Sequence, residues 1–195
     1  TQVPFVGRAE VIDRVMARVV AGEPVVLTGE VGIGKSRVLA DVVQRHRRTG
    51  ARVAWCACSE HPDTAIATLV ELAAALGVEL DRALPPITAF RAAVSASLQS
   101  GSMVLLAVDD LDRAGPTSAA ALQDAARLDG VSLVATVSDV DLLPVDLHPE
   151  ARVEVGPLDD EELRELAAVL RGRPIEGDDH ALEWLVTMSG GNPTL

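Results

Sequence analysis

Residues 29–36 read GEVGIGKS and match the pattern G-x-x-x-x-G-K-[ST] at every fixed position. The apolar run before them, residues 25–27, predicts a buried strand, and the spacing after them, residues 37–48, predicts a helix. A loop in this setting turns its backbone N–H groups inward, and the positive end of the helix dipole points the same way. This P-loop pattern predicts a site for Mg²⁺ and the phosphates of ATP or ADP, with GTP less favoured.

Lys35 and Ser36 are expected to carry the charge chemistry of this loop. We expect Lys35 on an exposed loop, where it serves the ligand rather than the core, reaching the terminal phosphates as both a binding and a catalytic residue. The Ser36 hydroxyl is expected to ligate Mg²⁺. The other expected nucleotide contacts in this segment are Gly29, Val31, Gly32, Ile33, Gly34 and Arg37.

Short apolar runs alternate with segments of helical periodicity along most of the chain. The runs predict strands at residues 25–27, 53–58, 103–108, 131–137 and 152–155. Helices are predicted at residues 8–20, 37–48, 64–76, 85–100, 116–128, 159–170 and 178–188. The alternation predicts an α/β fold, a P-loop NTPase parallel sheet with helices on both faces, over residues 1–156. A capping box of Asp159 and Glu162 opens the beginning of a small helical lid subdomain, residues 157–195.

A second candidate element lies in the middle of the chain, where residues 104–110 read VLLAVDD. A buried parallel strand that ends in carboxylates can place them beside the phosphate loop. We therefore expect Asp109 to hold Mg²⁺ through water or through Ser36, and Asp110 to orient or deprotonate the attacking water. Asp112 is interpreted as a solvated residue or a helix cap.

Four segments together resemble one known group of proteins: FVGRAE at residues 5–10, the P-loop, the strand ending in two aspartates, and GPL at 156–158 followed by SGGNP at 189–193. The chain resembles the ATPase module of the STAND class within the AAA+ group. It is most similar to the large ATP-binding LuxR-type regulators of actinobacteria. The resemblance implies that Val6, Gly7 and Arg8 lie against the adenine, and that Pro193 is brought from the helical subdomain to the nucleotide.

The chain departs from that family in two places. The family usually shows LHWAD after the paired aspartates, whereas residues 111–115 here read LDRAG. The family also ends its next strand in Thr-x-Arg, whose arginine senses the γ-phosphate, whereas this chain has Thr136, Val137 and Ser138. A serine supplies no fixed positive charge, so hydrolysis is expected to be slow unless Arg113 takes that role.

The composition limits the classes of partner. A net charge of −12 disfavours binding to DNA or anionic lipid. Without an apolar stretch of membrane-spanning length or a signal peptide, the chain is expected to be cytoplasmic.

Three further groups of residues are interpreted as structural. Cys56 and Cys58 are interpreted as small buried thiols. The basic run at residues 45–48 has two interpretations: a patch for a partner or nucleic acid and, as the favoured one, a set of cations stabilised by a helix C-terminus. His61, His148 and His180 are interpreted as surface residues.

These observations predict the ATP-binding switch of a multidomain LuxR-type transcription regulator, which binds Mg-ATP or ADP and hydrolyses ATP slowly. Its partners would be the nucleotide and further DNA-binding and sensor domains of the same chain, with self-association left open. Two alternatives remain. One is an AAA+ ATPase of the replication-initiator or remodelling type, and the other is a degenerate scaffold that binds nucleotide only for stability.

Overall fold

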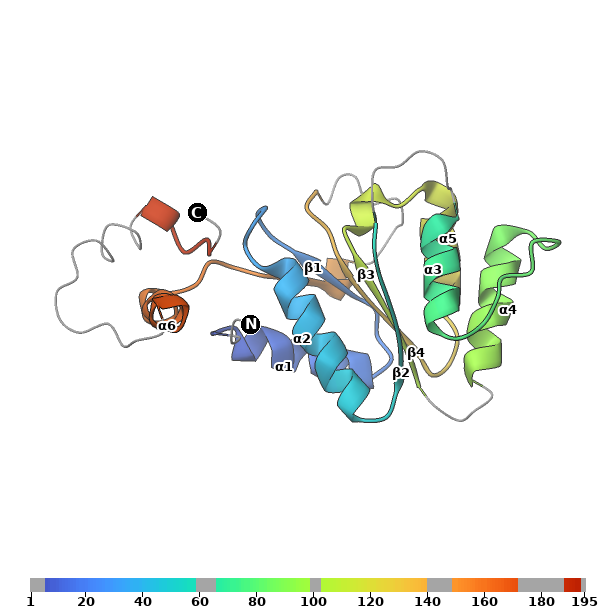
Figure 1. The fold of residues 1–195 in the computed structure, drawn as a ribbon, viewed down its shortest axis with the longest axis horizontal. Helices are drawn as coiled ribbons and strands as arrows, with labels where there is room; N and C mark the ends of the chain where they lie inside the picture. Colours follow the sequence, from blue (N-terminus) through green and yellow to red (C-terminus); the bar gives the residue numbers. More distant parts are fainter. Residues whose placement is uncertain (1–5, 59–65, 99–102, 140–148, 172–187, 194–195) are drawn as a thin grey trace.

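The described residues form a parallel α/β fold. A computed structural model of the chain describes residues 6–58, 66–98, 103–139, 149–171 and 188–193. Within them one five-stranded sheet has the order β2-β3-β4-β1-β5, and every neighbouring pair of strands is parallel (Figure 1). Its strands are β1 (Val25–Thr28), β2 (Arg52–Ala57), β3 (Val104–Asp109), β4 (Val131–Thr136) and β5 (Arg152–Glu154). The predicted P-loop NTPase sheet is confirmed.

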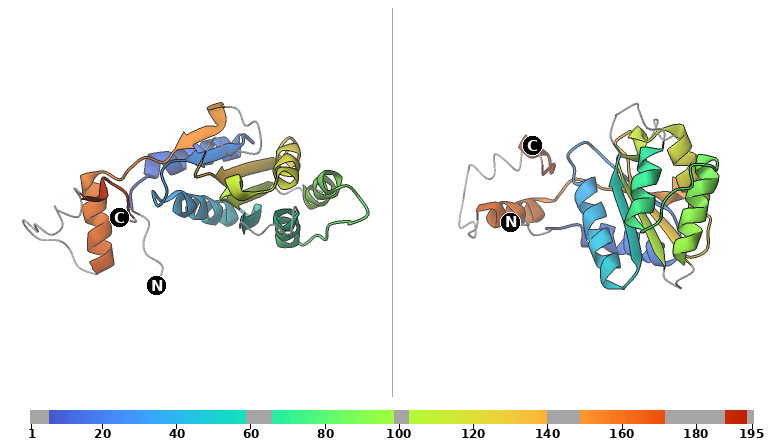
Figure 2. Two further views of the ribbon diagram at one scale, coloured as in Figure 1. Left: turned by 90° about the horizontal axis from the view of Figure 1, so that it is seen from above. Right: turned by 45° about the vertical axis from the view of Figure 1, so that its right-hand side comes forward.

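Helices cover both faces of this sheet, as predicted. They are α1 (Ala9–Val20), α2 (Lys35–Arg48), α3 (Ala67–Ala75), α4 (Pro86–Leu98), α5 (Pro116–Ala125) and α6 (Asp160–Arg171), with the short 3₁₀ helices η1 (Leu111–Arg113) and η3 (Pro149–Ala151). The helices α1 and α2 share one apolar cluster with the sheet, and α3, α4 and α5 share the other. Figures 1 and 2 show α6 outside these layers, near the start of α1.

The central strand β3 explains the two-sided core. Its side chains alternate, so that Leu106 and Val108 pack with Phe90 in one cluster, while Leu105 and Ala107 belong to the other. A strand buried on both faces has no polar position until its end, which accounts for the uninterrupted apolar run that precedes Asp109. Cys56 and Cys58 are both buried in the first of these clusters, which confirms their interpretation as buried thiols.

Most element boundaries lie within three residues of their predicted positions. The helix α2 begins at Lys35 rather than at residue 37, because the phosphate loop leads directly into it. The helix α5 ends at Ala125 rather than 128. The predicted helix at 178–188 lies almost entirely outside the described residues, as do His61, His148 and His180.

In the part of the chain that the structure describes, no helix combines the length and apolar character needed to cross a membrane.

The basic run at residues 45–48 forms the last turn of α2, where the helix dipole favours cations. Arg45 pairs with Asp41 one turn earlier at 2.6 Å. His46 does not fit that interpretation, because it is only 4% exposed and neither ring nitrogen has a hydrogen-bond partner among the described residues. Burial lowers the pKa of His46, so its ring is neutral near pH 7.

Candidate functional site

The candidate site lies where three parallel strands end at one edge of the sheet. The phosphate loop follows β1, Asp109 is the last residue of β3, and Thr136 is the last residue of β4. Strand β4 lies between the other two, so its end separates the loop strand from the aspartate strand. Ligands of open parallel sheets bind outside the carboxyl ends of the strands, and the predicted phosphate and Mg²⁺ residues meet at that edge.

The backbone of the loop has the curvature that a phosphate cradle needs. Gly34 caps the N-terminus of α2 with φ 103°, a conformation that residues with a Cβ rarely adopt. The side chains of two expected contact residues point away from the cradle: Val31 is 77% exposed, and Ile33 is buried in the core beside α1 and α2. Val31 and Ile33 can therefore contribute only backbone groups to the cradle, as can Gly29 and Gly32, whereas Arg37 begins the exposed face of α2.

Lys35 differs from the expectation that it stands on an exposed loop. It is the first residue of α2 and only 6% exposed. Its ammonium group donates to the carbonyl oxygens of Gly29 and Glu30, each at 2.9 Å. Burial lowers the pKa of Lys35, while the neighbouring carboxylates of Asp110, Asp112 and Asp109 act in the opposite direction. The loop thus folds around the lysine, which makes Lys35 a part of the loop structure as well as a phosphate ligand candidate.

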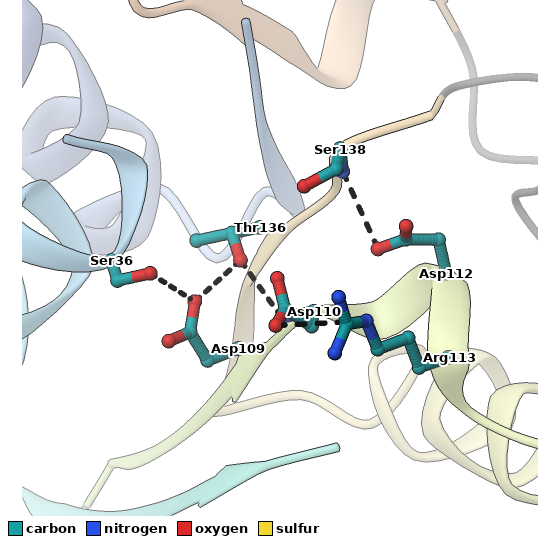
Figure 3. Close-up of polar contacts among 7 residues, drawn as sticks. All are labelled: Ser36, Asp109, Asp110, Asp112, Arg113, Thr136 and Ser138. Atoms are coloured by element: carbon teal, nitrogen blue, oxygen red, sulfur yellow. Dashed lines mark hydrogen bonds and ion pairs between the residues drawn. The ribbon is translucent and has the colours of Figure 1, made fainter. Parts of the chain in front are cut away.

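Ser36 and Asp109 come together as the sequence predicted. The Ser36 hydroxyl donates to Asp109 Oδ1 at 2.9 Å, across 73 positions of sequence (Figure 3). A hydroxyl and a carboxylate are the hard oxygen ligands that Mg²⁺ prefers. Both side chains reach the solvent-facing side of the sheet edge, because Ser36 is exposed and Asp109 is partly so. The residues present therefore fit the metal that the phosphate loop implies.

Thr136 is a site residue that the sequence reasoning did not assign. Its side chain is completely buried, and its hydroxyl donates to Asp109 Oδ1 at 2.5 Å. The Thr136 hydroxyl oxygen in turn accepts the backbone N–H of Asp110 at 2.9 Å. The threonine was noted only as the first position of an incomplete Thr-x-Arg pattern. The register of β3 and β4, which aligns Val108 with Ala135, was needed to place it beside the aspartates.

Asp110 lies in a strained conformation at the end of β3. Its φ of 55° and ψ of 51° place it in the left-handed region, where it begins η1. Burial raises the pKa of its carboxyl group, and the charge of Asp109 raises it further, while Arg113 at 3.9 Å from Oδ2 lowers it. Strained backbone and a raised carboxyl pKa often occur together at functional sites. This setting is compatible with the predicted role on an attacking water.

Asp112 contacts Ser138 and does not cap η1, which leaves only the solvated alternative of its interpretation. Asp112 is partly buried within η1, and its Oδ1 accepts the backbone N–H of Ser138 at 3.4 Å (Figure 3). The helix cap is Asp110 rather than Asp112, because the chain turns immediately after β3. Ser138 is exposed just beyond β4, on the same side as Asp110 and Arg113. The position at which the family carries an arginine thus contacts Asp112, two residues after the candidate catalytic aspartate.

The segments at the two ends of the chain also reach the loop. Val6 is buried, and Arg8 caps α1 while its guanidinium donates to the Ile33 carbonyl at 2.7 Å. Pro193 is exposed, and its neighbour Asn192 donates from Nδ2 to the Val31 carbonyl at 3.0 Å. Both segments thus contact the phosphate loop, the C-terminal one through the asparagine, while the contacts of Val6, Gly7, Arg8 and Pro193 with a nucleotide stay predictions. The family motif pointed to the proline and gave no sign of the asparagine.

The sequence and the fold are similar to those of known proteins. The family sequence model described as AAA ATPase domain matches residues 4–137, which is more than half of the chain. No curated protein sequence is similar enough to count as a relative. Among solved structures, Cdc6p from Pyrobaculum aerophilum shares 16% identity and a TM-score of 0.71, over 100% of this chain and 58% of its own.

Two further archaeal structures are similar. ORC1 from Aeropyrum pernix, solved in complex with DNA, shares 18% identity and a TM-score of 0.67, over 97% of this chain and 56% of its own. The Walker-type ATPase of Pyrococcus abyssi shares 16% identity and a TM-score of 0.68, over 97% of this chain and 65% of its own. This chain therefore spans less than two thirds of each structure, and at such identities the likeness concerns the fold. From the family match and this fold, the chain belongs to the AAA ATPase domain family.

Proposed function

We propose that this chain binds ATP or ADP with Mg²⁺ and works as the nucleotide-dependent switch of a LuxR-type transcription regulator. The observation that carries the nucleotide site is the hydrogen bond between Ser36 and Asp109, 2.9 Å long, at the mouth of a loop that encloses Lys35. The residues that a Mg-nucleotide site requires thus come from the phosphate loop, α2 and β3 and meet at one edge of the sheet.

Each residue of the site has a stated role in this proposal. The backbone N–H groups of Gly32 and Gly34 bind phosphate oxygens, and Lys35 exchanges one of its carbonyl partners for a β- or γ-phosphate oxygen. Ser36 and Asp109 hold Mg²⁺, which neutralises charge on the phosphates when bound. Gly29, Val31, Ile33 and Arg37 complete the loop, and Val6, Gly7, Arg8 and Pro193 are assigned to the base side of the nucleotide.

Hydrolysis in this proposal is slow. Asp110 holds the attacking water, and its raised pKa makes its carboxylate a stronger base than an ordinary aspartate. Ser138 provides no positive charge for the transferring phosphoryl group, and Arg113 is occupied in part by its ion pair with Asp110. A long-lived triphosphate state suits a switch, because the signalling state lasts as long as the bound ATP.

The regulatory context rests on the four resembling segments and on the division of the chain into residues 1–156 and 157–195. In this proposal residues 157–195 begin a helical lid whose position depends on whether ATP or ADP is bound. Further DNA-binding and sensor domains of the same polypeptide would read that position. The contact between Asn192 and the phosphate loop supports such a link.

The competing function is that of a replication-initiator ATPase, which the structural likeness to Cdc6p and ORC1 favours. The net charge of −12 argues against direct DNA binding by this part of the chain. A gel-shift assay with this chain alone separates the two. We expect no sequence-selective binding, and salt-sensitive, sequence-selective binding would favour the initiator function instead.

The direct test of the nucleotide site is the identity of the nucleotide released when the purified protein is denatured, together with calorimetric titration of Mg-ATP and Mg-ADP. Bound ADP is the expected result for a resting switch. A protein that releases no nucleotide and shows no heat of binding with either ligand would contradict the proposed function.

A further inference from the structure

Two carbonyl groups of the phosphate loop are held by polar side chains from outside the loop. Asn192 Nδ2 donates to the Val31 carbonyl at 3.0 Å, and the Arg8 guanidinium donates to the Ile33 carbonyl at 2.7 Å. A planar trans peptide points its N–H opposite to its carbonyl. Holding these two carbonyls outward therefore turns the N–H groups of Gly32 and Gly34 toward the opposite side, which is the side of the cradle.

Asn192 is a rigid donor despite its place near the chain end. It is 5% exposed, and it follows a turn that packs closely on the segment after β5. The Leu158 N–H donates to the Gly191 carbonyl at 2.8 Å. A Cβ at Gly191 would lie 2.4 Å from the Pro157 side chain, so only glycine allows this approach. The orientation of Asn192 is thus set by the contacts that the preceding residue, Gly191, makes with the GPL segment at residues 156–158.

Arg8 depends on the same part of the chain through Glu162. Arg8 has φ 60°, a left-handed conformation that is unfavourable for residues other than glycine. Glu162 Oε1 accepts the Arg8 backbone N–H at 3.0 Å, while its Oε2 accepts the Asp159 N–H, also at 3.0 Å, in the predicted capping box. The carboxylate also lies so close to Gly7 that a Cβ there would be 2.3 Å from Oε1. One carboxylate of α6 therefore caps its own helix and fixes the backbone of Arg8.

We infer that Asn192 and Glu162 are positioning residues for nucleotide binding: they hold the phosphate loop in its anion-binding form, Asn192 directly and Glu162 through Arg8. The inference rests on the proposed function and adds to it a physical connection between the C-terminal segment and the loop. Because coupling between two sites is reciprocal, a nucleotide that requires inward N–H groups at Gly32 and Gly34 also stabilises the contacts of α6 and Asn192 with the loop.

The first test uses Asn192→Leu, which keeps the approximate size of the side chain and removes its N–H donor without adding a charge beside the phosphates. Loss of one buried hydrogen bond corresponds to roughly tenfold in affinity. We expect Mg-ATP affinity to fall about tenfold by calorimetric titration, while affinity for adenosine, which carries no phosphate, stays unchanged. Glu161→Gln, on the exposed face of the same region, is the matched control and should bind both ligands as wild type does.

The second test is a double-mutant cycle of Glu162→Ala with Arg8→Met. If Glu162 acts through the Arg8 side chain, each single variant weakens Mg-ATP binding and the double variant is no weaker than Arg8→Met alone. Additive losses would overturn the indirect role of Glu162. If Asn192→Leu does not fold, Asn192→Ser replaces it with the same expected result, and a folded variant that keeps wild-type Mg-ATP affinity overturns the role of Asn192. A wild-type protein that does not bind Mg-ATP would instead contradict the proposed function itself.

Discussion

The Thr136 hydroxyl donates to Asp109 Oδ1 at 2.5 Å and accepts the N–H of Asp110 at 2.9 Å. One completely buried side chain of β4 therefore fixes the carboxylate of the first aspartate and the backbone of the second. The metal ligand candidate and the catalytic candidate are consequently not independent, and a change at Thr136 should affect both.

Thr136→Val keeps the shape of the side chain and removes its hydroxyl. We expect the free energy of unfolding to fall by about 1–3 kcal/mol, because the Asp110 N–H loses its partner. The Mg²⁺-dependent part of ATP affinity should fall as well, since Asp109 is no longer oriented toward Ser36. Titration of ATP with and without Mg²⁺ measures this, and Thr136→Ser should restore it. A variant that is destabilised but keeps the full effect of Mg²⁺ would limit Thr136 to a structural role.

Lys35→Met keeps most of the buried apolar stem and removes the charge. Tight triphosphate binding should be lost, with affinity about 100-fold lower, because a charge-assisted hydrogen bond to phosphate has no replacement. The variant should remain folded, although the Gly29 and Glu30 carbonyls lose the partner seen at 2.9 Å. Circular dichroism and calorimetric titration test both points. Unchanged ATP affinity in the folded variant would refute the assignment of the loop.

Ser138→Arg should raise the rate of phosphate release from pre-bound ATP in single-turnover experiments. Ser138 lies beyond β4 in contact with Asp112, and a guanidinium introduced there could stabilise charge on the transferring group. The matched variant Arg113→Gln tests the competing source of charge. Brisk wild-type hydrolysis that Ser138→Arg leaves unchanged, and that Arg113→Gln abolishes, would assign the role to Arg113.

Asp110→Asn should remove hydrolysis while leaving ATP bound. Asparagine tolerates the left-handed conformation observed at this position, so the backbone can stay in place while the base is lost. Phosphate release over hours, compared with retention of labelled ATP on the protein, separates catalysis from binding. Turnover equal to that of wild type would exclude Asp110 as the base.

His46 predicts acid sensitivity of the fold. The unfolded chain protonates this histidine near pH 6.5, whereas burial lowers the pKa in the folded state. Below about pH 6.5 the unfolded state therefore binds more protons, and the free energy of unfolding falls as pH falls until the folded-state pKa is reached. His46→Leu should flatten this dependence in urea unfolding at pH 7 and pH 5. An equal loss of stability in both proteins would assign the acid sensitivity to other groups.

The sequence was sufficient where a motif or the end of a parallel strand places a residue, and insufficient where a contact depends on the position of α6. The alternating runs predicted the parallel sheet, and the ends of β1 and β3 predicted that Ser36 and Asp109 meet. The capping box predicted that Asp159 and Glu162 bond to each other, as they do. It could not predict that the second oxygen of Glu162 reaches Arg8, which is 154 positions away and depends on where α6 lies.

The two misjudged side chains share one cause. Lys35 is expected on an exposed loop because it serves the ligand, and His46 is expected among the cations at a helix C-terminus, yet both lie on the buried face of α2. Helical periodicity places them with Val38, Leu39 and Val42 along that helix, so the register of α2 carried the signal. For both residues, the position along α2 predicts burial better than the residue type does.

The way the chain leaves the sheet has a mechanical consequence. The strand β5 is three residues long and pairs with β1, and just after it the Val155 N–H donates to the Thr28 carbonyl at 2.8 Å. The Val155 carbonyl lies so close to Gly29 that a Cβ there would be 2.5 Å away. Tension applied to the chain beyond Val155 would thus load the peptide groups at the start of the phosphate loop first. The affinity of this loop for its ligand is therefore expected to depend on pulling force. The short pairing of β5 with β1 would be the first contact to separate.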